Sequence, residues 1–238
     1  MSYDIDLTGK RVLVVGGSSG IGKATAHLFA RANAAVFVAA RQSERLDCAA
    51  AKLGATPIAL DTRDNAAVEA VFSDAQPFHH VIVSASQTEV GSVAHLPLDD
   101  AKAAMESKFW GAYRIARAAR IEPSGSLTLV SGVLGVRPNA ASVLLGAINA
   151  ALEGLVRGLA LEMAPIRVSA ISPGTVDTPL WSGLPEEKRG ALFAATANRL
   201  PVGRVGQPDD IAAAILFTAI NGFVTGTTIR VDGGGTIA

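Results

Sequence analysis

The stretch that decides the fold of this chain is Val12-Leu13-Val14-Val15-Gly16-Gly17-Ser18-Ser19-Gly20-Ile21-Gly22. Its four apolar residues have the composition of a strand buried on both faces, and residues 23–32 repeat apolar side chains at helical spacing. A glycine-rich turn between a strand and a helix directs free backbone N–H groups and the helix dipole at an anion. An ordinary strand-to-helix connection is the alternative. We predict a nucleotide phosphate site here, formed by Gly16, Ser18, Ser19, Gly20, Ile21 and Gly22.

Strand-like and helix-like segments alternate along the whole chain. Strands are predicted at 11–15, 35–40, 57–60, 80–83, 126–131, 167–171 and 227–231. Helices are predicted at 23–32, 44–53, 65–74, 98–119, 140–163, 185–198 and 208–220. Strands separated by helix-length crossovers indicate an α/β fold, with a doubly wound parallel sheet covered by helices on both faces. Because no tract resembles a linker or a repeat, residues 1–238 are predicted to form one domain.

The composition excludes several classes of protein. Of 238 residues, 49% are hydrophobic and only 18% are charged, which suits a globular domain whose surface is partly covered by partner subunits. Basic and acidic residues balance at 21 each without a basic stripe, which argues against nucleic acid as a partner. Cys48 is the only cysteine, and no residues have metal-ligand spacing, so no metal is expected. The acidic start and the absence of an evident membrane span predict a cytoplasmic protein.

The glycines Gly16, Gly20 and Gly22 match the Gly-x-x-x-Gly-x-Gly cofactor loop of the short-chain dehydrogenase/reductase family, and the resemblance extends over nearly the whole chain. It implies a Rossmann-type domain of about seven strands that binds a nicotinamide dinucleotide. It also implies a lid-like insert at about 180–200, whose apolar side chains suggest a small apolar substrate. The alternative is that these side chains pack on the body or on another subunit. The two long helices, rich in alanine and glycine, suit the paired-helix homodimer or homotetramer of relatives.

Arg41 directly follows the second predicted strand, where dinucleotide-binding folds recognise the adenosine ribose. An acidic side chain there accepts a hydrogen bond from the 2′-hydroxyl of NAD, whereas an arginine pairs with the 2′-phosphate of NADP. Ala40 stands where NAD-preferring relatives usually carry Asp. We therefore expect NADP(H) to be preferred over NAD(H), with a solvated arginine as the alternative.

Three further segments resemble cofactor-binding parts of the family. Asp61 resembles an aspartate that contacts adenine, or else it caps the helix that follows. The family's Pro-Gly loop at the nicotinamide end corresponds to a segment that includes Pro173, Gly174, Val176 and Thr178. After the fourth strand the family usually has Asn-Asn-Ala-Gly, where this chain has Ser84, Ala85, Ser86 and Gln87. Gln87 lacks the backbone freedom of glycine, so we expect a differently built cofactor floor.

The catalytic positions of the family are also replaced. The resemblance places Leu145 at the tyrosine position, Asn149 at the lysine position, Gly132 at the serine position and Lys108 at the asparagine position. A positioned general acid typically contributes about 10²–10⁴ in rate, and a leucine cannot supply it. The sequence therefore predicts that any catalysis uses a different proton donor.

No tyrosine is available nearby to take over that role. The chain's only tyrosines are Tyr3 and Tyr113, and Tyr113 lies about 140° around the predicted helix from Lys108. It is therefore expected to face away from the cleft.

Relative to the family, a lysine and an asparagine have exchanged places between the two long predicted helices. Lys108 stands on the first of these helices and Asn149 on the second. If the helices pack as in relatives, both side chains line one cleft, and we predict that Lys108 supplies a cationic or proton-donating group held by Asn149. Ser131 is a candidate hydrogen-bond donor in that cleft, or else a strand-end cap. The alternatives for Lys108 are a snorkelling side chain with its ammonium in water, or a group that binds the cofactor or another anion.

Two functions from different classes follow. One is an NADP(H)-dependent oxidoreductase that transfers a hydride to or from a small carbonyl or alcohol, with a non-standard proton donor. The other is a catalytically silent NADP(H)-binding sensor or partner subunit.

Overall fold

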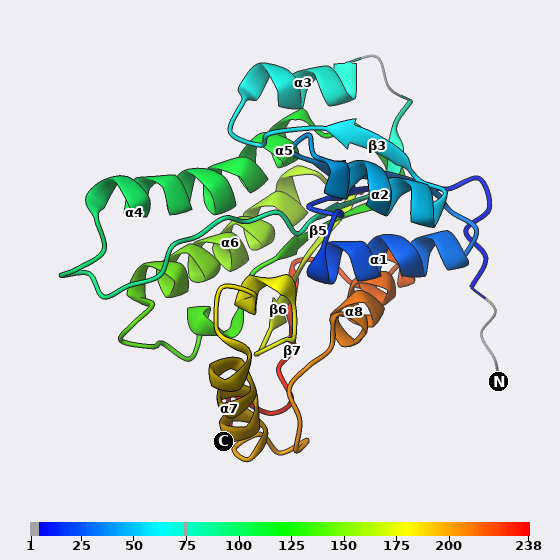
Figure 1. The fold of residues 1–238 in the computed structure, drawn as a ribbon. Coiled ribbons are helices and arrows are strands. Elements are labelled where there is room, and N and C mark those ends of the chain that lie inside the picture. Colours follow the sequence, from blue (N-terminus) through cyan, green and yellow to red (C-terminus); the bar gives the residue numbers. More distant parts are fainter. Residues whose placement is uncertain (1–4, 74–75) are drawn as a thin grey trace.

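The computed structural model describes residues 5–73 and 76–238, and its centre is a parallel sheet in the order β3-β2-β1-β4-β5-β6-β7 (Figure 1). Every pair of neighbouring strands runs parallel. The predicted doubly wound sheet is therefore confirmed. Its strands are β1 (Arg11–Val15), β2 (Ala35–Ala40), β3 (Thr56–Ala59), β4 (Phe78–Val83), β5 (Ile121–Val130), β6 (Arg167–Pro173) and β7 (Thr227–Val231).

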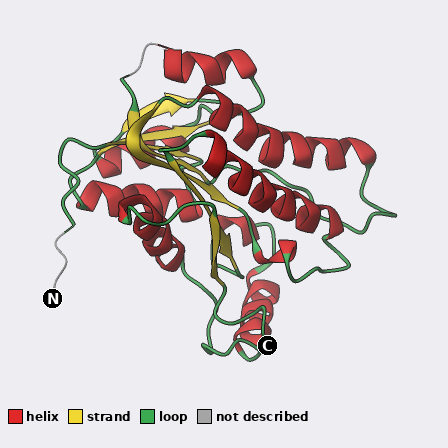
Figure 2. Ribbon diagram, turned by 180° about the vertical axis from the view of Figure 1, so that it is seen from behind, coloured by secondary structure: helices red, strands yellow, loops and turns green. Residues whose placement is uncertain are grey.

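Helices cover both faces of this sheet (Figures 1 and 2). Buried residues of α1, α2 and α8 pack on one face, and those of α3, α5 and α6 pack on the other. Helix α7 follows β6, in the region where the sequence suggests an insert. The helices are α1 (Gly20–Arg31), α2 (Glu44–Leu53), α3 (Asn65–Ser73), α4 (Leu98–Met105), α5 (Gly111–Ala118), α6 (Val143–Glu162), α7 (Glu186–Ala197) and α8 (Pro208–Ile220).

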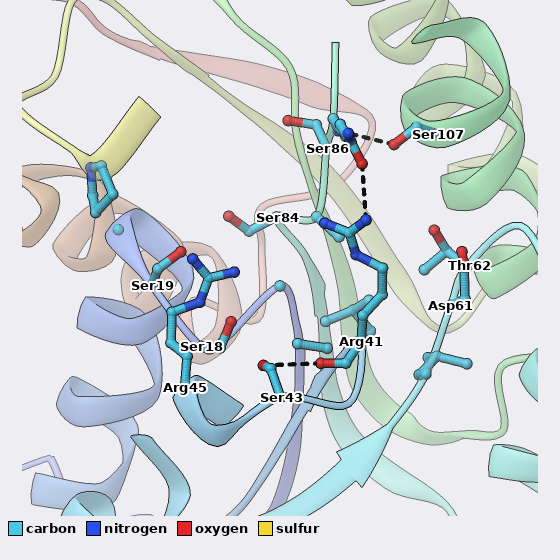
Figure 3. Close-up of a pocket in the computed structure, with 18 of the residues that line it drawn as sticks. Ser18, Ser19, Arg41, Ser43, Arg45, Asp61, Thr62, Ser84, Ser86 and Ser107 are labelled. Carbon is cyan, nitrogen blue, oxygen red and sulfur yellow. Dashed lines mark hydrogen bonds between the residues drawn. The ribbon is translucent and has the colours of Figure 1, made fainter. Parts of the chain in front are cut away.

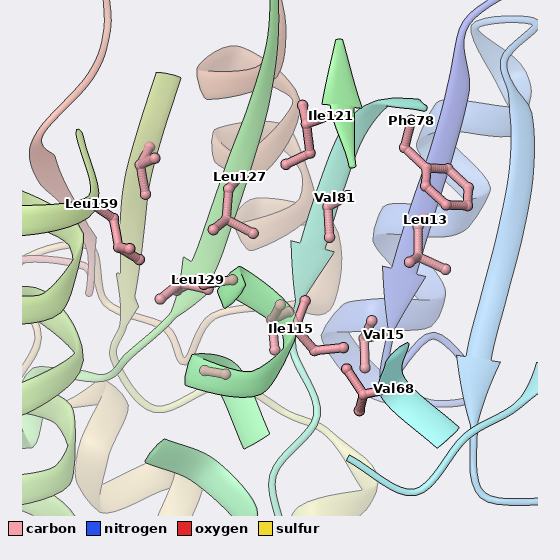
Figure 4. Packing of buried hydrophobic residues seen from close by; sticks show 14 of the residues in the cluster. Leu13, Val15, Val68, Phe78, Val81, Ile115, Ile121, Leu127, Leu129 and Leu159 are labelled. Atoms are coloured by element: carbon pink, nitrogen blue, oxygen red, sulfur yellow. The ribbon is translucent and has the colours of Figure 1, made fainter. Parts of the chain in front are cut away.

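Alternate residues of the central strands fill the two core layers. In β1, Leu13 and Val15 belong to the layer under α3, α5 and α6, whereas Val12 and Val14 belong to the opposite layer. Successive side chains of a strand point to opposite faces, so an unbroken apolar strand is expected where both faces are covered. Figure 4 shows the first layer, where Ile115 of α5 lies over the strands.

Element boundaries differ from the sequence-based expectation in two informative places. The helix expected at 98–119 is divided into α4 and α5 by one π-helical turn, η1 (Glu106–Trp110). A π-turn differs from the surrounding α-helix in its backbone hydrogen bonds and not in its amino-acid composition. The spacing of apolar residues in the sequence therefore did not reveal it. The strand expected at 126–131 is longer, Ile121–Val130. Asp74, placed at the end of the predicted helix 65–74, lies outside the described residues.

Helix α6 corrects the expectation that no segment could span a bilayer. By length and composition it is long and apolar enough to cross a membrane, with a mean hydropathy of 1.5. Its apolar side chains have another role here, because Leu152, Val156 and Leu159 are buried in the core against the sheet. Core helices of globular proteins also pass this test of length and composition, and 39% of the apolar window of α6 is buried.

Candidate functional site

The glycine-rich turn after β1 forms a cradle that larger residues would obstruct. Gly16 has a φ of +86°, and a Cβ there would lie 2.5 Å from the backbone nitrogen of Ala85. A Cβ at Gly22 would lie 2.2 Å from the carbonyl oxygen of Gly16, so only glycine allows this packing. Ser19 is the N-cap of α1, and its side chain makes no capping hydrogen bond. The turn thus presents a helix N-terminus and a free hydroxyl to a ligand.

A cavity of about 610 Å³ opens at the carboxyl ends of the strands around this cradle (Figure 3). Crevices at this edge of an open α/β sheet are where such folds bind nucleotides. The cradle, the helix N-terminus and the arginines of the lining fit a dinucleotide. Of the predicted cofactor residues, those that line the cavity are Gly16, Ser18, Ser19, Gly20, Ile21, Arg41, Asp61, Ser84, Ala85 and Thr178.

The remaining predicted cofactor residues lie beside the cavity lining or beneath it. Gly22 is buried below the cradle. In the Pro-Gly loop, Pro173 ends β6, and the Gly174 N–H donates a 3.0 Å hydrogen bond to the carbonyl oxygen of Val231 in β7. The carbonyl oxygen of Val176 accepts a 2.9 Å hydrogen bond from the indole N–H of Trp181. This loop therefore fixes the start of the segment that leads to α7, and Thr178 lines the cavity.

Asp61 is paired with a neighbour that the sequence did not single out. Its carboxylate accepts hydrogen bonds from the Arg63 guanidinium at 2.6–3.1 Å, and these bonds lower the pKa of Asp61 to about 2. The cap of α3 is Asp64, which accepts from the backbone N–H of Ala67 at 3.1 Å. The alternative of Asp61 as that cap was wrong. Arg63 lines the cavity with its charge already balanced.

The positive charge of Arg41 helps to lower the pKa of Asp61, although the two side chains do not pair directly among the described residues. The Arg41 Nη1 donates a 3.0 Å hydrogen bond to the amide oxygen of Gln87, and no ion pair of the described residues involves Arg41. Arg45, in the first turn of α2, also lines the cavity (Figure 3). Sequence reasoning missed Arg45, although its position four residues after Arg41 was a usable signal. Two arginines that form no ion pair among the described residues, Arg41 and Arg45, therefore line the cavity.

Lys108 lies on the π-turn η1, next to the cavity-lining Ser107. Its Nζ donates a 3.0 Å hydrogen bond to the carbonyl oxygen of Ser131, just beyond the end of β5. Burial lowers the pKa of Lys108 to about 8. The snorkelling alternative was wrong, because the ammonium is held against the protein instead of extending into water.

Ser131 and Asn149 are both buried, with 4% and 2% of their surfaces exposed. The Ser131 hydroxyl donates to a carboxylate oxygen of Glu153 at 2.9 Å, so it points to α6 and only its carbonyl oxygen meets Lys108. The expected bond between Lys108 and Asn149 is not formed among the described residues, and the Asn149 Oδ1 has no partner there. The sequence analysis did not identify Glu153, although this residue lies one turn beyond Asn149 on the same helix face.

Gly132 and Asn149 fit each other. The backbone of Gly132 is extended, and a Cβ added there would lie 2.8 Å from the Asn149 Nδ2. The amide nitrogen of Asn149 thus points at the space that a side chain at position 132 would fill. The residue types at positions 132 and 149 are therefore sterically linked.

Comparisons with known proteins agree with this geometry. A family model described as enoyl-(acyl carrier protein) reductase matches residues 15–236. The 3-oxoacyl-(acyl-carrier-protein) reductase FabG of Thermotoga maritima is 31% identical over 247 residues, covering 96% of this chain and 98% of the relative. The galactitol 2-dehydrogenase (L-tagatose-forming) of Cereibacter sphaeroides is 32% identical, with 97% and 96% covered.

Solved structures give the same result. A small-chain dehydrogenase in complex with NADPH has a TM-score of 0.86 and 37% identity, with 96% of this chain and 99% of that chain covered. The MalC reductase/Diels-Alderase of Malbranchea aurantiaca has a TM-score of 0.92 at 25% identity, with 99% of each chain covered. With its glycine cradle, its parallel sheet and a match along almost its entire length, the chain belongs to the short-chain dehydrogenase/reductase family of NAD(P)-dependent oxidoreductases.

Proposed function

We propose that this protein is an NADP(H)-dependent oxidoreductase in which Lys108 is the proton donor for a small carbonyl substrate. The observation that carries the proposal is the placement of Lys108, which is fixed to the Ser131 carbonyl oxygen in surroundings that bring its pKa to about 8. A general acid works best when its pKa lies near the working pH. An ordinary exposed lysine, with a pKa of 10.5, would hold its proton too firmly.

The pattern of replaced residues supports a proton donor other than tyrosine. By resemblance, Leu145 takes the tyrosine position, and Tyr113 packs edge-on against Trp110 with 41% of its surface exposed. Tyr3 lies outside the described residues. We therefore assign the proton-donating role in the cleft to Lys108, and the Asn149 Nδ2 points at the space beside Gly132.

A dinucleotide held by the glycine cradle and Arg41 would supply a hydride to the carbonyl carbon, or would accept one from the alcohol carbon in the reverse direction. In reduction, the Lys108 ammonium gives its proton to the carbonyl oxygen, and the neutral amine regains a proton from solvent. In oxidation, the neutral amine of Lys108 takes the hydroxyl proton. The Ser131 carbonyl oxygen holds Nζ in place in either direction.

Preference for NADP(H) is supported by the guanidinium groups at one end of the cavity. Arg41 and Arg45 would hold a 2′-phosphate bound at this end, and neither forms an ion pair among the described residues, whereas Arg63 is neutralised by Asp61. Arginine pairs with phosphate through charge-assisted hydrogen bonds. A related structure contains NADPH, which agrees with this assignment.

An apolar substrate is supported by the segment between β6 and α7. Leu180 is exposed at the cavity, and Trp181 packs edge-on against Phe193 of α7 with ring centroids 6.0 Å apart. We propose that this segment, about 180–200, closes over a small apolar carbonyl compound or alcohol. A panel of apolar ketones and aldehydes with NADPH tests this, and the absence of turnover across the panel counts against it.

We further propose that the chain assembles as a homodimer or homotetramer and acts in the cytoplasm. Apolar side chains of α4, η1 and α6 surround a surface depression of about 390 Å³, including Leu98, Met105, Trp110 and Leu144. Exposed apolar surface of this kind favours association. Sedimentation at micromolar concentration tests the assembly, and a monomer would contradict it.

The second candidate is an NADP(H)-binding protein without catalysis. The observation that favours it is the leucine at the tyrosine position, together with the orientation of the Ser131 hydroxyl away from the cleft. Fluorescence titration with NADPH and a carbonyl panel separate the two functions. Binding with oxidation of NADPH supports the enzyme, whereas tight binding without oxidation supports the sensor or partner subunit.

A further inference from the structure

Gln87 connects two elements on either side of the cofactor cradle. Arg41 follows β2 and Gln87 follows β4, and these strands flank β1 in the sheet. Neighbouring strands lie about 4.8 Å apart, so the ends of β2 and β4 are about 10 Å apart. The 3.0 Å bond from Arg41 Nη1 to Gln87 Oε1 therefore crosses the carboxyl end of β1, where the cradle begins.

The backbone of Gln87 is itself held in place. Its N–H donates a 2.9 Å hydrogen bond to the hydroxyl oxygen of Ser107 on the π-turn η1 (Figure 3). Ser107 directly precedes Lys108 in the chain. A connected series of hydrogen bonds thus runs from the π-turn through Gln87 to the Arg41 guanidinium.

The chemistry of the amide decides what this contact does. A guanidinium has five N–H donors, and a single bond to an amide oxygen leaves the others available. The amide is neutral, so it orients Arg41 without cancelling its positive charge. Arg63 shows the contrasting case in the same cavity, because the Asp61 carboxylate binds its guanidinium and compensates its charge. Arg41 is oriented and still attracts an anion, whereas Arg63 is already paired.

We propose that Gln87 is a positioning residue that selects NADP(H), because it holds the Arg41 guanidinium ready for the 2′-phosphate. This inference rests on the proposed cofactor preference. It assigns a role to the residue that, by resemblance, stands at the family's glycine position. The side chain of Gln87 acts through Arg41, and the Ser107 hydroxyl holds the backbone of Gln87 in place.

Dissociation constants for NADPH and NADH, measured by fluorescence at one fixed salt concentration, test the proposal. Gln87→Ala is expected to weaken NADPH binding about three- to tenfold and to change NADH binding less than about twofold. Gln87→Glu is expected to weaken NADPH binding at least about tenfold, because a carboxylate would pair with Arg41 and repel the phosphate. Ser107→Ala should have a smaller effect in the same direction.

A double-mutant cycle distinguishes positioning from damage to the loop. In an Arg41→Ala background, the effect of Gln87→Ala on NADPH binding should disappear, since the residue acts through Arg41. Equal losses for both nucleotides, or a loss that persists without Arg41, would overturn the inference. Unchanged NADPH binding in Gln87→Ala would overturn it while leaving the cofactor preference intact. A wild-type protein that does not prefer NADPH overturns the preference itself, and this inference with it.

Discussion

The Nζ of Lys108 and the carbonyl oxygen of Ser131 are 3.0 Å apart, and the hydrogen bond between them joins the π-turn η1 to the end of β5. Single π-turns within α-helices occur frequently at functional sites. Here the turn carries both Lys108 and the cavity-lining Ser107. The arrangement links the proposed proton donor to the cofactor cavity through two adjacent residues.

The pKa of Lys108, lowered to about 8 by burial, predicts opposite pH dependences for the two directions of the reaction. Reduction needs the protonated amine, so kcat/KM for a carbonyl should fall as the pH rises above about 8. Oxidation needs the neutral amine, so its rate should rise through the same range. Rate profiles between about pH 6 and pH 10 check this. Parallel profiles in the two directions would argue against Lys108 as the titrating group.

The same lowered pKa predicts how stability depends on pH. Between about pH 8 and pH 10.5, the unfolded chain holds a proton at Lys108 that the folded chain has released. The free energy of unfolding of wild type, relative to Lys108→Met, should therefore rise with pH across this window. The expected rise is on the order of 3 kcal/mol, since a tenfold change in proton binding corresponds to about 1.4 kcal/mol. Urea unfolding at several pH values measures this rise, and a difference that does not change with pH would contradict the lowered pKa of Lys108.

Arg41→Ala should weaken NADPH binding about ten- to a hundredfold and leave NADH binding nearly unchanged, because only NADPH carries the 2′-phosphate. Arg63→Ala provides the matched comparison from the same cavity. Its charge is compensated by Asp61, so we expect a loss of NADPH affinity below about threefold. Titration of both variants with NADPH and NADH measures the dissociation constants. A larger loss of NADPH affinity in Arg63→Ala than in Arg41→Ala would contradict the assignment of Arg41 to the 2′-phosphate.

Gly132→Ala should destabilise the fold by about 1–3 kcal/mol, because its Cβ would lie 2.8 Å from the Asn149 Nδ2. In an Asn149→Ala background that cost should largely vanish, since the obstructing amide is gone. Gly190→Ala in the interior of α7 is the control, because a Cβ there meets no atom within 4 Å. Alanine should stabilise that helix by up to about 1 kcal/mol. Thermal unfolding measures the stability of Gly132→Ala, of its combination with Asn149→Ala and of Gly190→Ala. If the stability losses at positions 132 and 149 simply add, the steric link is refuted.

Ser131→Ala should destabilise the protein by about 1–3 kcal/mol, because it leaves a buried Glu153 carboxylate oxygen without its hydroxyl donor. Adding Glu153→Leu to Ser131→Ala should recover part of that loss, since both polar partners are then removed. Denaturant unfolding of the single and double variants measures the recovery. Without any recovery, the Ser131–Glu153 bond would not be the source of the loss.

Much of the fold follows from the sequence because its signals are local. The apolar run before Gly16 predicts β1, and the helical spacing after it predicts α1. Along the rest of the chain, the same alternation between apolar strand segments and helical spacing predicts the other strands of the sheet. The cavity also follows, because residues at the carboxyl ends of parallel strands must meet at one edge. Arg41 and Asp61 come together with the cradle for that reason.

The hydrogen-bond partners around Lys108 could not be predicted, because they depend on tertiary packing. Helical spacing alone gave no sign of the π-turn that directs Lys108 to the Ser131 carbonyl oxygen instead of to Asn149. Similarly, the carboxylate of Glu153 and the amide of Gln87 acquire roles only through residues distant in sequence, Ser131 and Arg41. Sequence periodicity identifies which face a residue occupies, but not which polar atom it meets.

The most direct test of the central claim compares NADPH oxidation by wild type and Lys108→Met at saturating cofactor, with a carbonyl substrate found in the panel. Lys108→Met should lower turnover by at least about 100-fold, while the NADPH dissociation constant should stay within about twofold of the wild-type value. Equal turnover in the two proteins would contradict the central claim.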